Sequence, residues 1–369
     1  MSINPPFRAD IVGSFLRPES VKHARAEHEA GRLDDAGLRA VEDDAIIDLI
    51  AKQREAGLRL ATDGEARRAW WHYDFFGGLD GVDVVDSDHG IQFTGVQTRP
   101  QVLRITDRIG FSRQHPMLAH FAFLRDHVGE GVTPKMTIPS PAVLHFRLEE
   151  DAIQTGAYAD RDELLDDLAA AYRDAVRAFY DDGCRYLQFD DTAWAYLCSA
   201  DELEKAAARG IRIDGLAERY AALINGALAD KPADLTVTTH VCRGNFRSTW
   251  IASGGYEPVA EQLLAVTKYD GYFLEYDSAR AGGFEPLRFL PEGDKTVVLG
   301  LITSKSGALE DPDEVKRRIE EAAEFAPLGQ LALSTQCGFA STEDGNVLTE
   351  DEQWAKVREV VRVAAEVWG

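Results

Sequence analysis

Eight short apolar runs alternate along this chain with longer amphipathic segments, and this alternation constrains the fold more than any other feature. Strands separated by helices form parallel sheets, because each helix returns the chain to the same edge of the sheet. The runs are Asp10–Ser14, Leu58–Asp63, Lys135–Pro139, Arg185–Asp190, Leu235–Cys242, Tyr272–Asp277, Thr296–Ile302 and Leu331–Thr335. Eight parallel strands close a (β/α)8 TIM barrel. We therefore predict an α/β fold of this type, with residues 1–369 forming one catalytic domain.

The segments between the runs carry the signals of helix ends. Asp160, with Glu163 three residues later, resembles a capping box, and Gly183 stands where that helix is expected to end. Asp311-Pro312 marks another start, because aspartate caps a helix and the N–H that proline lacks has no partner in the first turn. These boundaries agree with the predicted strands.

One stretch departs from the alternation. Residues 81–111, between the second and third predicted strands, contain Ile91–Phe93 and Val102–Ile105, in which apolar and polar residues alternate. This period is typical of antiparallel strands, so we predict a β-hairpin insertion. Two interpretations stay open: a cover over the barrel mouth, or a surface decoration that contacts another subunit of a homo-oligomer.

The charge of the chain narrows the class of partner. Lysine and arginine number 40 and aspartate and glutamate 63, which gives a formal net charge of −23. Such a chain repels nucleic acid and anionic membrane surfaces, and no run approaches the roughly 18 apolar residues of a membrane span. We expect small-molecule partners, and neither nucleic acid nor membrane.

Cysteine usage indicates the compartment. The four cysteines, Cys184, Cys198, Cys242 and Cys337, are too few for a disulfide scaffold of this size. The first residues lack a basic segment followed by an apolar core. We expect a protein of the reducing cytoplasm.

Four residues at the ends of predicted strands have the chemistry of zinc ligands: His240, Cys242, Glu275 and Cys337. His240 and Cys242 are two residues apart, so both side chains project to the same side of an extended segment. Structural zinc sites usually cluster their cysteines in Cys-x₂₋₄-Cys pairs, whereas these ligands are spread over three strands. The set therefore predicts catalytic zinc, which makes a coordinated thiol a thiolate at neutral pH. Glu275 is the ligand most easily displaced by an incoming sulfur, because it is the one hard oxygen donor beside two soft sulfurs.

Other polar and aromatic residues follow predicted strands at the same edge of the barrel, where active sites of this fold lie. Glu65 and Asp190 are candidates to hold the ammonium group of an amino-acid substrate, and Ser14 to contact its carboxylate. Each carboxylate also has an ordinary explanation as a helix cap or an ion-pair partner. Aromatic residues after Glu65 are candidates to line a pocket, although core packing explains at least half of them: Trp70, Trp71, Tyr73, Phe75 and Phe76.

Taken together, these residues resemble the catalytic half of cobalamin-independent methionine synthase, in particular its short single-barrel relatives. The segments that carry the resemblance occur in the family's order: Val12-Gly13-Ser14-Phe15, Asp63-Gly64-Glu65 with Arg68, Tyr186 to Asp190, Thr239-His240-Val241-Cys242, Leu274-Glu275 with Arg280, and Gln336-Cys337-Gly338. The resemblance implies zinc on His240, Cys242, Glu275 and Cys337, with homocysteine on Ser14, Glu65 and Asp190. It further implies methyl transfer from a 5-methyltetrahydrofolate, as a mono- or polyglutamate, to the thiolate of homocysteine.

The chain departs from the family pattern at three places. It has one barrel where full-length members have a second that helps contact the folate. Asp191-Thr192 stands where the family has Glu-Pro, and Ser304-Lys305 where it has a histidine. Lys305 is a candidate to stabilise anionic groups of donor or acceptor, or a solvated loop lysine.

Three alternatives accompany this interpretation. An epoxyalkane:coenzyme M transferase-like enzyme would alkylate another thiol, with Lys305 or Arg243 binding a sulfonate. A metal-free decarboxylase-like barrel would need no thiol ligands. Zinc storage or a structural zinc site would not respond to thiols.

Overall fold

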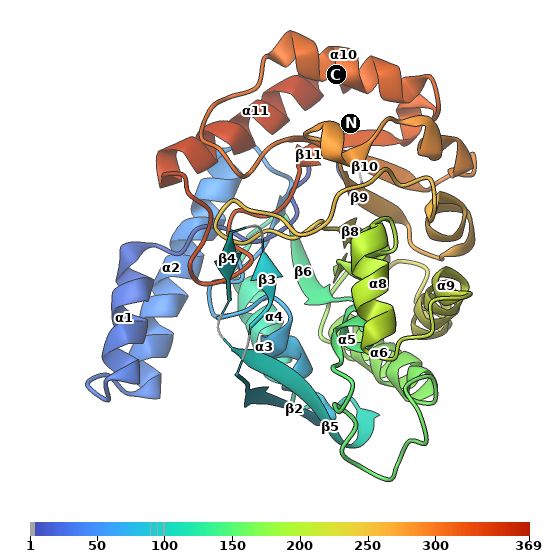
Figure 1. The fold of residues 1–369 in the computed structure, drawn as a ribbon. Coiled ribbons are helices and arrows are strands. Elements are labelled where there is room, and N and C mark those ends of the chain that lie inside the picture. The colour runs from blue at the N-terminus through green and yellow to red at the C-terminus, as the bar shows by residue number, and fades with distance from the viewer. Residues whose placement is uncertain (1–3, 89, 94, 99) are drawn as a thin grey trace.

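The structure is a computed structural model that describes residues 4–88, 90–93, 95–98 and 100–369. Its centre is a curled parallel sheet of seven strands in the order β1-β6-β7-β8-β9-β10-β11 (Figure 1). The strands are β1 (Leu60–Ala61), β6 (Thr133–Pro139), β7 (Tyr186–Asp191), β8 (Thr236–Val241), β9 (Gly271–Glu275), β10 (Thr296–Ile302) and β11 (Leu331–Thr335). The predicted parallel α/β architecture is confirmed, and strands β10 and β11 have the predicted bounds.

The first predicted strand, Asp10–Ser14, does not form. Ala9, the residue before this segment, makes one isolated parallel bridge with Leu333 of β11. The backbone carbonyls of Val12 and Gly13, within this segment, accept hydrogen bonds from side chains. Gln188 Nε2 donates to Val12 O at 2.7 Å, and Thr62 Oγ1 donates to Gly13 O at 2.6 Å. Because side chains occupy these carbonyls, the segment passes beside β11 without a strand ladder.

Helices cover the outside of the sheet, with α10 and α11 beside β10 and β11 (Figure 1). They are α1 (Glu19–Glu29), α2 (Asp35–Glu55), α3 (Tyr73–Phe76), α4 (Pro116–His127), α5 (Pro141–Arg147), α6 (Leu164–Asp181), α7 (Ala193–Tyr196), α8 (Ala200–Ala208), α9 (Leu216–Ala227), α10 (Pro312–Ala323) and α11 (Glu350–Trp368). Four short η elements complete the set: η1 (Glu261–Val266), η2 (Ala279–Ala281), η3 (Glu285–Phe289) and η4 (Leu328–Gln330). No described helix is long and apolar enough to cross a membrane.

The predicted helix ends are correct in kind. Asp311 caps α10 by accepting a hydrogen bond from the backbone of Asp313, and Gly183 takes a φ of +97° after α6. Asp160 accepts a hydrogen bond from the backbone of Glu163, although α6 itself begins four residues after Asp160, at Leu164. That reciprocal turn therefore precedes the helix instead of starting it.

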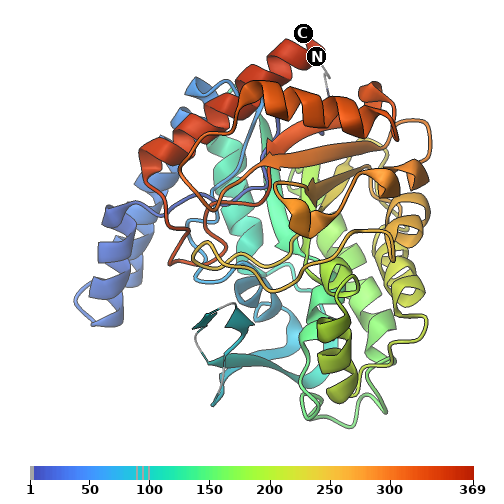
Figure 2. The same cartoon turned by 45° about the horizontal axis from the view of Figure 1, so that its top comes forward.

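The insertion between β1 and β6 contains an antiparallel pair, β2 (Asp80–Asp86) and β5 (Gln101–Gly110), whose register matches Val82 with Ile105. A smaller pair, β3 (Gln92–Phe93) and β4 (Val96–Gln97), lies between them in the chain. In Figure 2 these four strands lie at the lower left of the molecule. The insertion therefore contains two antiparallel pairs, in which Val102–Ile105 pairs with β2 and Gln92–Phe93 pairs with β4.

Candidate metal centre and active site

The four predicted ligands meet at the carboxyl edge of the sheet. His240 lies in β8, Cys242 directly follows it, Glu275 ends β9, and Cys337 follows β11. One potential ligand atom from each residue lies within 4.8 Å of the others, and all four residues are buried. The two sulfur atoms are 3.6 Å apart. The sheet thus brings residues nearly 100 positions apart into one potential metal site.

The hydrogen bonding of this cluster fits a metal ion. Among the described residues, neither ring nitrogen of His240 nor Oε2 of Glu275 has a hydrogen-bond partner. Glu275 Oε1 accepts a hydrogen bond from the backbone N–H of Arg243 at 2.9 Å, which orients the carboxylate. Buried polar atoms without partners are costly, and a cation bound by all four side chains would satisfy one ring nitrogen of His240 and Oε2 of Glu275. Two sulfurs, one imidazole and one carboxylate are donors that suit zinc.

The pKa values of the four clustered side chains are shifted by burial and by the neighbouring side chains. The hydrogen bond with Cys242 holds the pKa of the Cys337 thiol well below its ordinary value and raises the pKa of Cys242. Burial lowers the pKa of His240, but the Cys337 sulfur outweighs it and the net shift is upward. Burial raises the pKa of Glu275, which Lys305 opposes. The residues form one coupled group in which a negative sulfur is already favoured.

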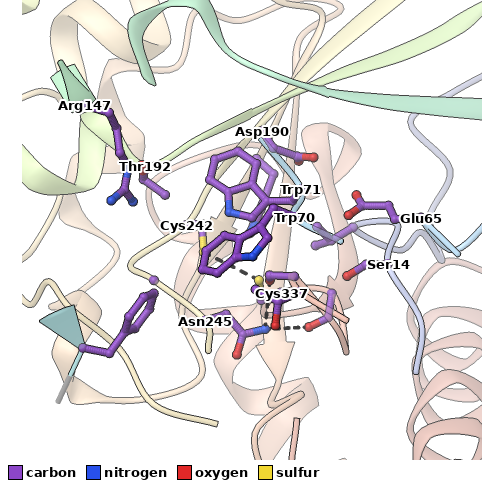
Figure 3. Close-up of a pocket in the computed structure, with 17 residues that line it drawn as sticks. Ser14, Glu65, Trp70, Trp71, Arg147, Asp190, Thr192, Cys242, Asn245 and Cys337 are labelled. Carbon is purple, nitrogen blue, oxygen red and sulfur yellow. Dashed lines mark hydrogen bonds between the residues drawn. The ribbon is translucent and has the colours of Figure 1, made fainter. Parts of the chain in front are cut away.

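A cleft opens beside this cluster, with about 510 Å³ of empty space that is partly open to solvent. Each residue predicted to bind substrate lines it: Ser14, Glu65, Trp70, Trp71 and Asp190. His240, Cys242 and Cys337 also line it, whereas Glu275 does not. In Figure 3 the two indoles lie over the sulfur atoms, with Ser14 and Glu65 on one side and Arg147 and Thr192 on the other.

Glu65 has an unusual backbone and a firmly held side chain. Its φ is +58°, a left-handed conformation that is uncommon for residues other than glycine. Glu65 Oε1 accepts a hydrogen bond from Thr137 at 2.9 Å and lies 3.4 Å from Arg68 Nη1, while Oε2 has no partner among the described residues. Burial raises the pKa of Glu65. The free oxygen is placed to accept a donor from a bound molecule.

Asp190 lines the same cleft as Ser14 and Glu65. Gln188 Nε2 donates to Asp190 Oδ1 at 2.7 Å, and burial, followed by the charge of Glu65, raises the pKa of Asp190 to about 7. Two carboxyl groups in one buried cleft create a strong demand for a cation. An ammonium group would meet it.

Arg17 joins the loops that carry these residues. Its Nη1 donates to the carbonyls of Phe15 and Ala340, at 3.0 and 2.8 Å, and its Nη2 to those of Glu65 and Arg68, at 2.6 and 3.1 Å. These carbonyls belong to the loops of Ser14, Glu65 and Cys337.

Gly338 permits a further close approach, since a Cβ there would lie 2.0 Å from Ser14 Oγ. Only glycine fits this position without a shift.

The aromatic run divides between the cleft and the core. Trp70 and Trp71 line the cleft, and Trp70 also packs in the main hydrophobic cluster with Tyr73, Phe75 and Phe76, which do not line this cleft. Phe93 of β3 also lines the cleft, and its ring centroid lies 5.4 Å from that of Phe246. The insertion therefore reaches the barrel mouth.

Lys305 and Asp191 lie outside the cleft lining. Lys305 Nζ donates to Asn245 Oδ1 at 3.0 Å, and Asn245 in turn lines the cleft. Asp191 Oδ1 accepts a hydrogen bond from Ala193 N at 2.7 Å at the start of α7. The shorter carboxylate at position 191 thus serves the turn after β7.

The cleft is also lined by residues that the sequence did not indicate as part of a site: Phe93, Arg147, Thr192, Asn245, Ser341 and Thr342. Thr192 and Asn245 follow strands whose ends were recognised, so the strand-end pattern contained a signal for them. Arg147 ends a helix and Phe93 belongs to the insertion, and nothing in their local sequence indicates the cleft.

Known proteins resemble this chain along nearly its whole length. A family model described as the catalytic domain of cobalamin-independent synthase matches residues 7–366. The uncharacterised protein YxjG of Bacillus subtilis is 54% identical over 366 residues, which cover 99% of this chain and 95% of that protein. The methionine synthase of Sulfurisphaera tokodaii is 22% identical over 342 residues, covering 91% of this chain and 86% of that protein.

A solved structure agrees with the fold. The crystal structure of a candidate vitamin-B12 independent methionine synthase from Listeria monocytogenes superposes with a TM-score of 0.81 and 44% identity, over 99% of each chain.

Proposed function

Because the chain belongs to the cobalamin-independent methionine synthase family, we propose that it is a zinc-dependent S-methyltransferase that converts homocysteine to methionine. Membership supports methyl transfer as the reaction class. The observation that carries the proposal is the juxtaposition of a four-ligand cluster with a cleft that contains two buried carboxyl groups. The cluster suits a thiol, and the carboxyl groups suit the ammonium group of an amino acid.

The ligand residues provide the thiol-activating end of the site. Zinc, when bound, lowers the pKa of a coordinated thiol so that a thiolate is present at neutral pH. Glu275 is the ligand expected to yield to an incoming sulfur, and the hydrogen bond from Arg243 N holds its other oxygen meanwhile. Lys305 favours the anionic forms of Glu275, Cys242 and Cys337 through its charge.

The opposite end of the cleft orients the acceptor. Glu65 Oε2 and Asp190 accept hydrogen bonds from the ammonium group, and Ser14 contacts the carboxylate. Trp70 and Trp71 limit water around the sulfur. Holding both ends of a short amino acid fixes the direction in which its sulfur points, which favours in-line displacement.

The proposed donor is a 5-methyltetrahydrofolate. The homocysteine sulfur forms a bond to the methyl carbon while the bond from that carbon to N5 breaks. N5 keeps the electron pair and takes up a proton from solvent. No oxidant or reductant is consumed, so the balance needs only donor and acceptor.

Acceptor and donor are tested together in single-turnover assays of the zinc-loaded protein. Homocysteine and coenzyme M are compared as acceptors, with 5-methyltetrahydrofolate, its triglutamate and methylcobalamin as donors. We expect methionine from homocysteine and a methylfolate. Product from coenzyme M alone would contradict the proposed acceptor, and product from methylcobalamin alone the proposed donor.

Zinc-edge absorption spectra test thiol activation independently of turnover. We expect homocysteine to add a sulfur to the coordination of zinc and to remove an oxygen. Unchanged zinc–sulfur coordination would reject this role and support a storage or structural site.

A further inference from the structure

A second cleft adjoins the metal cleft, and we propose that it binds the carboxylate end of the methyl donor. This inference rests on the proposed function and deepens it. The second cleft encloses about 900 Å³ of empty space, partly open to solvent. Arg147 lines both clefts.

Three more chain segments run from one cleft into the other. Trp71 lines the metal cleft and Tyr73 the second, Phe93 the first and Gln92 the second, and Thr192 the first and Tyr196 the second. The two clefts are therefore neighbours along a common wall. A molecule whose methyl group reaches the metal cleft has the second cleft available for its remaining atoms.

The second cleft begins on the side of the metal cleft away from the acceptor residues. Figure 3 shows Arg147 and Thr192 across the indoles of Trp70 and Trp71 from Ser14 and Glu65. An acceptor held at Ser14 and Glu65 leaves the side of Arg147 free. In-line displacement needs the donor on the far side of the methyl carbon from the sulfur, which agrees with this placement.

The charge of the second cleft is opposite to that of the whole chain. Its lining contains the cations Arg147, Lys205 and Arg209 and the carboxylates Glu149 and Glu202, whereas the whole chain carries 63 acidic and 40 basic residues. Lys205 Nζ lies 2.6 Å from Glu202 Oε1, so this pair is neutral. The two arginines then face Glu149 alone, and one positive charge is left over.

Both arginines have spare donor capacity. Arg147 Nη2 donates to the hydroxyl of Tyr196 at 2.7 Å, and Arg209 Nη2 to the carbonyl of Phe146 at 3.0 Å. The Nε atoms of both arginines are buried without a partner among the described residues. Each guanidinium also lies 5.5 Å from the ring centroid of its aromatic neighbour, Tyr196 or Phe146. The aromatic contacts orient the guanidinium planes, and a carboxylate in the cleft would accept hydrogen bonds from their Nη groups.

The ligand that fits this arrangement is an elongated donor with a terminal carboxylate, as in a folate glutamate tail. The acceptor end of the site is acidic, through Glu65 and Asp190, and the donor end is basic, through Arg147 and Arg209. This polarity distinguishes an ammonium-bearing acceptor from a carboxylate-bearing donor before any chemistry takes place.

Arg209→Gln tests the inference, because Arg209 lines the second cleft but not the metal cleft. Arg212→Gln is the matched control: it removes the same charge three residues further on, where Arg212 pairs with Asp162 at 2.5 Å. Calorimetric titration of the zinc-loaded proteins with tetrahydrofolate triglutamate gives Kd at low and moderate salt, and steady-state assays give the KM values of both substrates.

We expect Arg209→Gln to raise the Kd and KM of the folate by about tenfold, the loss expected for one charge-assisted hydrogen bond. The KM of homocysteine, the zinc content and the behaviour of Arg212→Gln should stay unchanged. An unaltered Kd in Arg209→Gln, or an equal rise in Arg212→Gln, would overturn the inference. If the parent protein binds the triglutamate at Arg209 but makes no methionine, the proposed function fails and the carboxylate site stands. If the parent protein neither binds it nor turns over, both fail.

Discussion

At the scale of single residues, the site depends on side chains whose surroundings are incomplete without a ligand. His240, Glu275 and Glu65 each have buried atoms without a hydrogen-bond partner among the described residues. Such atoms destabilise a fold unless a ligand uses them. Glu65 adds a left-handed backbone, which costs on the order of 1–3 kcal/mol and is typical of functional positions. These costs are concentrated where we place metal and substrate.

Cys337→Ser tests the metal site. Serine replaces a soft thiolate with a weak hydroxyl ligand, so we expect zinc affinity to fall by more than the roughly 10–100-fold that loss of an outer-shell partner costs. Methyl transfer should be lost with the fold retained, because Cys337 lies at the barrel mouth. Metal analysis, turnover and circular dichroism measure the three properties. Cys198→Ser, outside the ligand set, is the control. Global unfolding of Cys337→Ser alone would indicate a structural zinc.

His145 makes stability depend on pH. Burial lowers its pKa to about 4, and its Nδ1 lies 2.9 Å from the Tyr220 hydroxyl. Asp162 favours the charged ring, whereas Arg161 and Arg219 oppose it. With an unfolded pKa of about 6.5, the unfolded chain binds more protons between these values, so stability present above pH 6.5 is lost as pH falls toward 4.

The expected loss from His145 between pH 7 and pH 5 is about 2 kcal/mol. Urea unfolding at both pH values measures it. His145→Asn, which keeps a polar group beside Tyr220, should reduce the pH-dependent difference by that amount. An unchanged difference in this variant would show that His145 is not the titrating group.

At the scale of elements, the strands present residues and the loops assemble them. Strands β7, β8 and β9 bring Asp190, His240 and Glu275 to one edge through their parallel register. Three irregular loops, which carry Ser14, Glu65 and Cys337, complete the site. Arg17 connects these loops through backbone carbonyls. Its guanidinium acts as a common anchor for segments that have no strand ladder with one another.

Arg17→Met is expected to raise the KM of homocysteine by about tenfold or more, because it removes several charge-assisted hydrogen bonds that position Ser14 and Glu65. The zinc ligands stay, so zinc should still bind. Arg25→Met is the control. The backbone carbonyls that accept hydrogen bonds from Arg25, those of Ala66 and Arg68, both lie in the loop after β1, so Arg25 does not connect this loop to the backbone of the other two.

Added guanidinium tests whether Arg17 positions the substrate-binding loops or only stabilises the fold. Arg17 lies at the wall of a surface pocket beside α1, so the small cation can reach the vacated position. Partial recovery of KM in Arg17→Met is expected. A lower unfolding midpoint with unchanged KM would assign Arg17 a structural role alone.

At the scale of the whole molecule, the fold and the metal site are separable. The main hydrophobic cluster lies between the sheet and its surrounding helices. The four candidate ligands lie at the carboxyl edge of the sheet. We therefore expect the barrel to fold without the metal. A ligand that binds only the folded state nevertheless stabilises it by mass action.

Removal of zinc with a chelator should therefore lower the thermal unfolding midpoint and leave the helical circular dichroism at 25 °C intact. Restored zinc at about 1,000 times its Kd should return about 4 kcal/mol of stability. Added magnesium, a hard cation that disfavours sulfur ligands, is the control. Loss of helical signal on chelation would show that the metal is structural.

The amino-acid sequence alone indicates which residues lie at the strand ends and what chemistry they carry. Hydrophobic periodicity reports burial over short stretches, so it indicates seven of the strands, and the side-chain chemistry at their ends marks His240, Cys242, Glu275 and Cys337 as candidate ligands. Parallel strands then require these ends to meet at one edge, whatever the intervening loops contain.

How the loops complete the site depends on contacts between distant parts of the chain. Asp10–Ser14 has the apolar pattern of a strand, yet side chains of Thr62 and Gln188, about 50 and 176 residues away, occupy its carbonyls. Arg17 reaches Ala340 across 323 residues, and Arg147 joins the two clefts. These contacts depend on which distant groups meet after the sheet has closed, and local periodicity contains no information about them.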